Sequence, residues 1–317
     1  MTAVGMIGFG AALPARVLTS VELGEPLGLT EDWIVERTGV RSRRVLGATE
    51  SLGELVAEAS TRALAAAGRT ADEVDHFVVA TTTPDDFMPA QAMSAGELAG
   101  INPGALVGDF VAACNGFAGA VVQAAAMIEA GRARLAVVCG AEALSRAIDY
   151  DDPKTAPLFG DGAGAVVLAP VTATAGIGPA VTGFEYRREA LYADRPTSLI
   201  RMRGREVFVN AVQRMSDSTI AALELAGRRV DDVGLLVLHQ ANARIVTAVC
   251  ERIGLDESRA VVNIEDVGNT SAASIPLALA AEFEAGRLAD DGLMVIAAFG
   301  GGFAWTAFTV AYEGVSP

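Results

Sequence analysis

Apolar and polar positions follow two patterns along the chain. Short, uninterrupted apolar runs rich in β-branched residues occur at 77–79, 135–138, 235–238 and 293–297, which predicts buried central strands. The segments 51–67 and 216–226 instead carry Ala and Leu at helical spacing. Strands that alternate with helices predict an α/β fold built in layers.

The chain contains an internal repeat. The helix, turn and strand pattern at 67–79 recurs at 226–238, an offset of 159 residues, and Glu-Ala-Gly-Arg at 129–132 recurs at 284–287, an offset of 155. We therefore expect two duplicated halves, 1–170 and 171–317. No linker rich in Pro, Ser or charge separates them, which predicts one compact body.

The second offset pairs Cys114 with Asn269. Each is expected to follow a strand, at 106–111 and 261–264, and to open a helix, so we predict that the two occupy equivalent places. His239 ends the predicted strand 235–238. Functional sites in α/β folds lie where strands end, so these three polar residues are the first candidates for chemistry.

Cys114 is the candidate nucleophile. A cysteine at a helix start faces free N–H groups and the positive end of the helix dipole, which predicts a lowered thiol pKa. Cys139, Cys250 and His76 are expected to be structural. Cys, His and Asn at three strand ends resemble a cysteine-nucleophile constellation.

Three glycine clusters raise the question of phosphate binding. The cluster at 8–10 lacks a third glycine and a following helix, and those at 159–164 and 299–303 lack Gly-Lys-Ser/Thr, so none predicts a nucleotide site. The two later clusters instead predict that another part of the backbone approaches these glycines closely. A backbone N–H of the last cluster could also donate a hydrogen bond to an oxyanion.

Composition and charge exclude several classes of function. Among 317 residues, 24 Lys and Arg stand against 39 Asp and Glu, a net charge of −15, which argues against a nucleic-acid partner. Three Cys and two His are too few for a disulfide framework or a metal site. No apolar run approaches the roughly 18 residues of a membrane span, so we expect a cytoplasmic protein with no membrane contact.

Six ordered motifs carry a family resemblance over nearly the whole chain. They are Asp-Trp-Ile at 32–34 with Arg-Thr-Gly-Val-Arg at 37–41, Ala-Ala-Cys at 112–114 with Gly-Phe at 116–117, Phe-Gly-Asp-Gly-Ala-Gly at 159–164, His-Gln-Ala-Asn at 239–242, Gly-Asn-Thr-Ser-Ala-Ala-Ser at 268–274, and Phe-Gly-Gly-Gly at 299–302. In these motifs the chain resembles the β-ketoacyl-acyl-carrier-protein synthase III family of the thiolase superfamily.

The resemblance implies a fold and a reaction. The fold is a five-layered α-β-α-β-α thiolase-like arrangement of two duplicated halves, as a homodimer. The reaction is the decarboxylative Claisen condensation of an acyl-CoA primer with malonyl-acyl-carrier protein through an acyl-cysteine, which initiates fatty-acid or polyketide synthesis. No cofactor or metal beyond the CoA thioesters is implied.

The resemblance also implies roles for individual residues. Cys114 would be acylated, its N–H and that of Gly301 would form the oxyanion hole, and His239 and Asn269 would stabilise the enolate left by CO₂ loss. The remaining roles are a wall of the decarboxylation site for Phe299, CoA binding for Trp33, Arg37, Asn242 and Lys154, carrier-protein docking for Arg244, Arg205 and Arg252, and closure of the partner subunit's acyl pocket for Phe87.

The chain departs from the family pattern at several positions. Pro153 stands where an arginine is common, with Lys154 as the nearest substitute, and Val209 and Glu251 replace basic residues of the docking face. The basic run Arg41, Arg43 and Arg44 is either a solvated face or an attraction for phosphates.

Two other readings of the constellation stay open at this point. An acyltransferase of the same fold would pass the acyl group to another acceptor without decarboxylation, and a cysteine hydrolase would use the histidine as a base. The intact Cys, His and Asn set favours condensation over the first, and the duplication argues against the second. The sequence leaves open the primer, the pathway, and whether the extender is carried by acyl-carrier protein or CoA.

Overall fold

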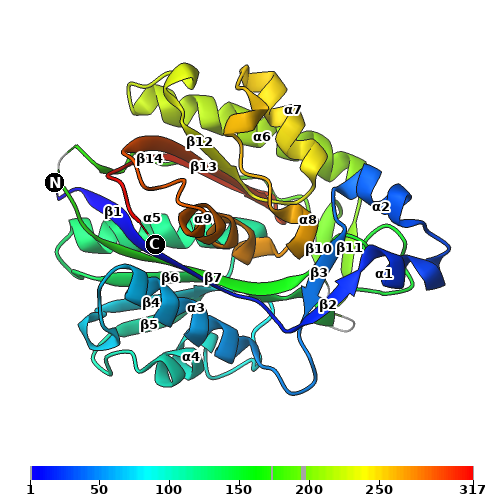
Figure 1. The fold of residues 1–317 in the computed structure, drawn as a ribbon, viewed down its shortest axis with the longest axis horizontal. Helices are drawn as coiled ribbons and strands as arrows, with labels where there is room; N and C mark the ends of the chain where they lie inside the picture. Colours follow the sequence, from blue (N-terminus) through cyan, green and yellow to red (C-terminus); the bar gives the residue numbers. More distant parts are fainter. Residues whose placement is uncertain (1, 173, 194–197, 317) are drawn as a thin grey trace.

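The fold is built on two five-stranded sheets (Figure 1). The computed structural model describes residues 2–172, 174–193 and 198–316. The first sheet has the strand order β1 (Val4–Ala12), β7 (Asp161–Pro170), β6 (Ala136–Ala143), β4 (His76–Ala80), β5 (Leu106–Phe110). The second has the order β12 (Leu235–Leu238), β13 (Gly292–Gly300), β14 (Ala304–Tyr312), with β8 (Gly176–Ile177) and β9 (Val181–Phe184) both paired to β14.

Three layers of helices enclose these two sheets (Figure 1). The outer layer on the first sheet is α3 (Leu52–Ala66) with α4 (Gln91–Ala99), and the outer layer on the second is α6 (Gly204–Leu225) with α7 (Ala243–Ile253). The middle layer is α5 (Gly116–Glu129) with α9 (Ser274–Glu284). The five-layered α-β-α-β-α thiolase-like fold is thus confirmed.

Smaller elements connect and flank the layers. They are β2 (Arg16–Thr19), α1 (Ser20–Leu27), α2 (Glu31–Thr38), β3 (Ser42–Val45), β10 (Leu191–Ala193), β11 (Ile200–Met202), α8 (Ile264–Val267) and the 3-10 turns η1 (Ala71–Glu73), η2 (Ala113–Asn115), η3 (Leu144–Arg146), η4 (Val230–Asp232), η5 (Glu257–Arg259) and η6 (Ser271–Ala273). The strand β7 ends at Pro170, the boundary expected between the halves.

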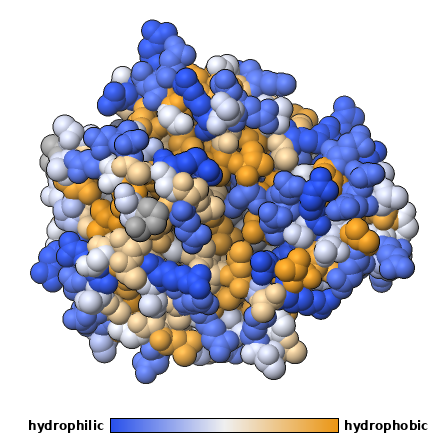
Figure 2. All heavy atoms as spheres, viewed as in Figure 1, coloured by the Kyte–Doolittle hydropathy of each residue, from blue (hydrophilic) through white to orange (hydrophobic). Residues whose placement is uncertain are grey.

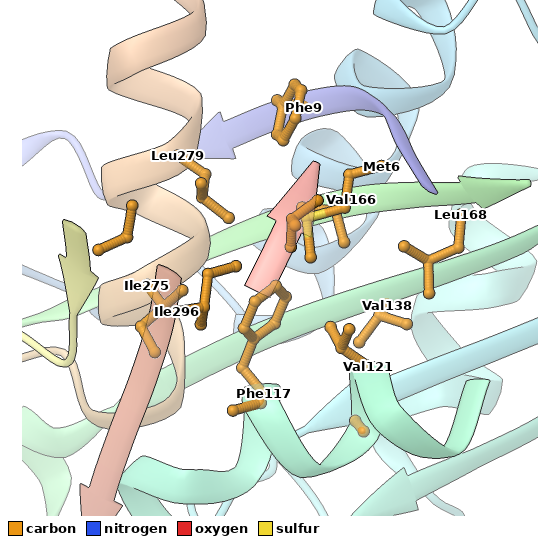
Figure 3. Packing of buried hydrophobic residues seen from close by; sticks show 14 of the residues in the cluster. Met6, Phe9, Phe117, Val121, Val138, Val166, Leu168, Ile275, Leu279 and Ile296 are labelled. Carbon is orange, nitrogen blue, oxygen red and sulfur yellow. The ribbon is translucent and has the colours of Figure 1, made fainter. Parts of the chain in front are cut away.

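The middle layer carries a core shared by both halves. Side chains from both sheets and from α5 and α9 meet in this core (Figure 3), among them Met6, Phe9, Phe117, Val121, Val138, Val166, Leu168, Ile275, Leu279 and Ile296. Two further cores lie between the sheets and the outer helices. On the face seen in Figure 2, hydrophilic residues dominate, with hydrophobic patches between them. Because one core spans the halves, the body can be compact without a linker.

Glycines allow strands to approach helices closely. A Cβ at Gly8 would lie 2.3 Å from the Ala63 carbonyl oxygen of α3, and one at Gly164 would lie 2.6 Å from the Leu277 nitrogen of α9. The first cluster therefore serves packing and not a dinucleotide, and the close approach expected of the second is confirmed.

The repeat is confirmed at η1 and η4 and at β4 and β12, but one predicted strand is wrong. The pattern at 261–264 does not form a strand, because Ala260 makes only an isolated bridge to Leu236 and α8 begins at Ile264. The helix expected at 216–226 is confirmed as the last part of α6, which begins twelve residues earlier, at Gly204.

Candidate active site

The candidate nucleophile lies on a tight turn between β5 and α5. Cys114 belongs to η2, and the residue before it, Ala113, has a φ of +48°. A side-chain-bearing residue held in this left-handed region typically costs about 1–3 kcal/mol and is found most often at functional sites. The turn places Cys114 at a cavity of about 1080 Å³, where the residue as a whole is half-buried.

The structure corrects the pairing of Cys114 with Asn269. Ser271 also has a φ of +48° and opens η6, and α9 then begins at Ser274, as α5 begins at Gly116. This match sets the offset at 158, so the counterpart of Cys114 is Ala272. The offset falls back to 155 at the helix ends because α5 has 14 residues and α9 has 11.

His239 and Asn269 nevertheless line the same cavity as Cys114. His239 follows β12, as predicted, and is 2% exposed. Burial lowers its pKa to about 3, so the imidazole is neutral. Asn269 is held through its backbone, since its N–H donates to the Leu158 carbonyl at 2.8 Å. Its side-chain Oδ1 accepts the Ser271 N–H at 2.9 Å, which leaves the amide NH₂ available to a substrate oxygen.

The prediction of a lowered thiol pKa at Cys114 is wrong. Burial raises the pKa to about 11, and the nearby Glu142 carboxylate raises it further, against hydrogen bonds from the Ser271 hydroxyl and the Gly301 N–H that lower it. The sulfur is enclosed and has lost most of its hydration, which disfavours the thiolate. In addition, Cys114 is not the first residue of α5, because this helix begins two residues later, at Gly116. The resting nucleophile is therefore a neutral thiol.

Two polar residues of the site escaped the sequence analysis. Glu142 is fully buried in β6 and accepts hydrogen bonds from Thr82, Thr83 and Ser271. Ser271 lies within the motif 268–274, where it was a candidate helix cap and not a residue of the site. The available signal was the acid at 142 in an otherwise apolar run, since a buried carboxylate requires partners.

The residues expected to bind CoA belong to the lining of the cavity. Trp33, Arg37, Lys154 and Asn242 all line it. The Arg37 guanidinium stacks 4.3 Å from the centre of the Trp33 ring, on a helix capped by the Thr30 hydroxyl. Asn242 caps α7 through the Arg244 N–H and donates to the Arg37 carbonyl at 2.8 Å, so it holds this part of the lining in place.

The other expected residues divide between the cavity and the surface. Phe299, buried at the end of β13, lines the cavity together with Gly301, Arg205 and Arg244. Arg252 is not among the described lining residues and forms an ion pair with Asp217 at 3.1 Å. Phe87 is 79% exposed, in the loop after β4, and does not reach the cavity of its own chain.

Both interpretations of the basic run are wrong for Arg43. This side chain is 1% exposed and donates to the Leu18 and Pro157 carbonyls, and burial lowers its pKa to about 10. Arg41 forms ion pairs with Glu31 and Glu265. Arg41, Arg43 and Arg44 are all absent from the described cavity lining.

Within the described residues, no group of His, Cys, Asp and Glu is arranged to hold a metal ion. None of the helices described there is both long and apolar enough to cross a bilayer.

Comparison with known proteins gives a consistent set of relatives. The family model for 3-oxoacyl-[acyl-carrier-protein] synthase III matches residues 108–184, and the model for its C-terminal part matches 223–312. A β-ketoacyl-[acyl-carrier-protein] synthase III of Rhizobium meliloti is 43% identical, covering 94% of this chain and 96% of that protein. One of Geobacillus kaustophilus is 42% identical over 97% and 98%.

Solved structures agree with these matches. The 3-oxoacyl-(acyl carrier protein) synthase III of Pseudomonas aeruginosa superposes with a TM-score of 0.94 at 38% identity, covering 99% of this chain and 100% of that one. The priming β-ketosynthase of the R1128 polyketide pathway superposes with a TM-score of 0.94 at 32% identity, covering 99% and 97%.

Proposed function

The chain belongs to the 3-oxoacyl-[acyl-carrier-protein] synthase III family, and we propose on that basis that it condenses an acyl-CoA primer with malonyl-acyl-carrier protein. The product is a β-ketoacyl-carrier protein that starts a fatty-acid or polyketide chain. The observation that carries the proposal is the meeting of Cys114, His239 and Asn269 in one cavity.

The first half-reaction is acyl transfer to Cys114. The thiol of Cys114 loses its proton as the sulfur attacks the primer thioester, and the N–H groups of Cys114 and Gly301 stabilise the oxyanion that forms. The carbon–sulfur bond to CoA then breaks, and the CoA thiolate leaves and takes up a proton. The position of Gly301 supports this role, because it lines the same cavity as Cys114. Trp33, Arg37, Asn242 and Lys154 would hold the CoA along the cavity wall.

The second half-reaction is decarboxylation and carbon–carbon bond formation. The neutral imidazole of His239 and the amide NH₂ of Asn269 donate hydrogen bonds to the malonyl thioester oxygen, which stabilises the enolate as CO₂ leaves. The enolate carbon then attacks the acyl-Cys114 carbonyl and expels the sulfur. Phe299 forms an apolar wall beside this step.

The low pKa of His239 argues against a cysteine hydrolase. A general base works best when its pKa is near the working pH, and a group with a pKa of about 3 is a weak base there. The non-decarboxylating acyltransferase would share the first half-reaction and lack the second, so only the second half-reaction separates it from condensation.

The expected assembly is a cytoplasmic homodimer that uses no cofactor beyond its CoA thioesters. The edge strand β5 supports pairing with a second copy, since Leu106 is 56% exposed and Val111, just after the strand, is 73% exposed. Phe87 would then reach the partner's acyl pocket. Arg244, Arg205 and Arg252 would bind the acidic carrier protein.

Intact-protein mass spectrometry tests the proposal. The protein is incubated with a panel of acyl-CoAs, and the acyl mass added to Cys114 identifies the primer. Malonyl-acyl-carrier protein or malonyl-CoA is then added to the acyl-enzyme. Loss of the acyl mass with release of CO₂ and a β-ketoacyl product supports condensation. Loss of the acyl mass without CO₂ would support the acyltransferase, and no adduct from any acyl-CoA would refute both.

A further inference from the structure

Arg43 is a buried cation that the proposed mechanism does not use. It lies in β3 and is 1% exposed. Its guanidinium donates to the Pro157 carbonyl at 2.8 Å, the Leu18 carbonyl at 3.3 Å and the Ser20 hydroxyl at 3.2 Å. All three acceptors are neutral, and no carboxylate of the described residues forms an ion pair with it. A charge buried without a counter-ion is unfavourable for stability, so its position points to a role in function.

The stem of Arg43 packs against two glycines that are next to cavity residues. Gly160 follows Phe159, and a Cβ at this glycine would lie 2.9 Å from the Arg43 Cβ. Gly268 precedes Asn269, and a Cβ there would lie 3.3 Å from the same atom. The two glycines therefore let β3 approach both segments closely, beside residues that line the cavity.

The same two segments are bonded to each other at Asn269. Its N–H donates to the Leu158 carbonyl at 2.8 Å, and its carbonyl accepts the Gly160 N–H at 3.1 Å. Both backbone groups of Asn269 are therefore held by the segment 157–160. The guanidinium of Arg43 holds the first carbonyl of that segment.

The chain that leads into Asn269 is also attached to this strand. The Arg41 N–H, just before β3, donates to the Glu265 carbonyl of α8 at 2.8 Å. α8 ends two residues before Asn269. The β3 region therefore holds both stretches of chain that meet at Asn269, one through its backbone and the other through the Arg43 side chain.

We propose that Arg43 is a positioning residue for decarboxylation, which acts by holding the segment 157–160 in place against Asn269. This inference rests on the proposed function, in which the Asn269 amide donates to the malonyl thioester oxygen. The amide has to meet that oxygen as the enolate forms, and a displacement of about 1 Å can cost about a hundredfold in rate. A planar guanidinium suits this task because it binds several acceptors in a fixed geometry.

Loss of the guanidinium should therefore affect the two half-reactions unequally. Cys114 lies on η2 and Gly301 follows β13, and none of the hydrogen bonds of Arg43 reaches either element. Acylation of Cys114 should continue. Decarboxylation should slow, because it depends on the position of the Asn269 amide.

Arg43→Met tests this difference, since methionine keeps an apolar stem and removes the charge and the donors. Acylation is read as the mass added to Cys114 in a single turnover at saturating acyl-CoA. Decarboxylation is read as labelled CO₂ released by enzyme that is already acylated, with saturating malonyl-acyl-carrier protein or malonyl-CoA, whichever the wild type uses faster. We expect acylation close to the wild-type rate and CO₂ release slower by about tenfold to a hundredfold.

Arg44→Met is the matched control. Arg44 is the next residue of β3, and its guanidinium donates to the Pro14 carbonyl at 3.0 Å, so this variant removes a comparable hydrogen bond from the same strand. That bond does not involve the segment 157–160, and both half-reactions should keep their wild-type rates.

Thermal unfolding of both variants measures the loss of stability separately. If Arg43→Met is unfolded at the assay temperature, Arg43→Lys replaces it. Lysine keeps the positive charge, but its ammonium group lacks the fixed planar geometry of the guanidinium, so the same unequal effect on the two half-reactions is expected.

Combination with Asn269→Ala shows whether Arg43 acts through Asn269. A residue that only positions Asn269 has no effect once that side chain is removed. CO₂ release by the double variant should therefore equal that of Asn269→Ala alone. A general loss of structure would instead lower the rate further, by the same factor as in the wild-type background.

Several outcomes would overturn this inference and leave the proposed function intact. They are unchanged CO₂ release in the folded Arg43 variant, equal loss of acylation and CO₂ release in that variant, a similar loss in Arg44→Met, and a double variant slower than Asn269→Ala. A wild-type enzyme that is acylated but releases no CO₂ would instead overturn the proposed function, and this inference with it.

Discussion

Substitution of His239 or Asn269 with alanine should separate the two half-reactions. In the proposed mechanism both groups donate to the malonyl thioester oxygen, the first as a neutral imidazole and the second through an amide whose oxygen is already occupied by the Ser271 N–H. Neither is needed for attack of Cys114 on a thioester. We therefore expect His239→Ala and Asn269→Ala to be acylated normally and to fail in decarboxylation.

The expected magnitude follows from the loss of one donor to a developing oxyanion. Such a loss costs about 2.7–4 kcal/mol, or roughly a hundredfold to a thousandfold in rate. The two variants should differ in stability. Asn269→Ala leaves the buried Ser271 N–H without its partner, which costs about 1–3 kcal/mol. His239→Ala removes no described side-chain hydrogen bond at Nδ1, so it serves as the control for that effect.

The assay follows each half-reaction alone. Acylation is read as the mass added to Cys114 by a single turnover of acyl-CoA, and decarboxylation as labelled CO₂ released from a malonyl thioester. Equal loss of both half-reactions in His239→Ala would refute the reasoning and indicate a base, as in a hydrolase. Unchanged CO₂ release in both variants would show that neither side chain stabilises the enolate.

Three further predictions address the nucleophile, the carrier surface and the packing. Cys114→Ala should abolish the acyl adduct at nearly unchanged thermal stability, and an adduct on either other cysteine would contradict the assignment. Glu251→Lys should raise the rate with malonyl-acyl-carrier protein at low salt, because it replaces a negative charge with a positive one on the surface expected to bind an acidic protein. The effect should become smaller as salt shortens the screening length, to about 10 Å at 0.1 M. An unchanged rate at low salt would exclude this surface as the docking face. Gly140→Ala should destabilise the protein by about 1–3 kcal/mol or more in thermal unfolding, because the new Cβ would lie 2.1 Å from the Ala272 carbonyl oxygen, and a wild-type melting temperature would refute that contact.

The sequence predicted the layered fold because burial on both faces imposes a readable pattern. The strands β4 and β12 appear as apolar runs in the sequence, and the repeat gives their equivalence directly. The strand predicted at 261–264 was wrong because its apolar pattern has another cause. The run at 261–264 is apolar because Val261 and Ile264 are buried beside β12 and on α8, and this kind of burial does not require a strand.

The site was predicted less completely because the pKa values of its side chains depend on how far the folded chain buries them. The positions of Cys114, His239 and Asn269 follow from motifs, but the direction of the thiol pKa depends on how deeply the sulfur is buried, which neither spacing nor helix position reveals. The burial of Arg43 was also not predictable from the sequence. This basic residue lies in a charged run, yet it is buried and donates to the carbonyl of Pro157, which is far away along the chain.

The duplication explains how the nucleophile and its hydrogen-bonding partners come to meet. η2 and η6 have the same backbone turn, each opened by a residue with a φ of +48°, and the helices that follow them share the middle layer. The first turn supplies the sulfur one residue after Ala113, whereas the second supplies the Ser271 hydroxyl at the position of Ala113 itself. One inherited turn therefore presents a nucleophile in one half and a hydroxyl in the other. The two turns also pack against each other. An alignment of the halves at the offset of 155 is wrong by three residues at these turns. The relationship therefore appears in the backbone geometry and not in the sequence.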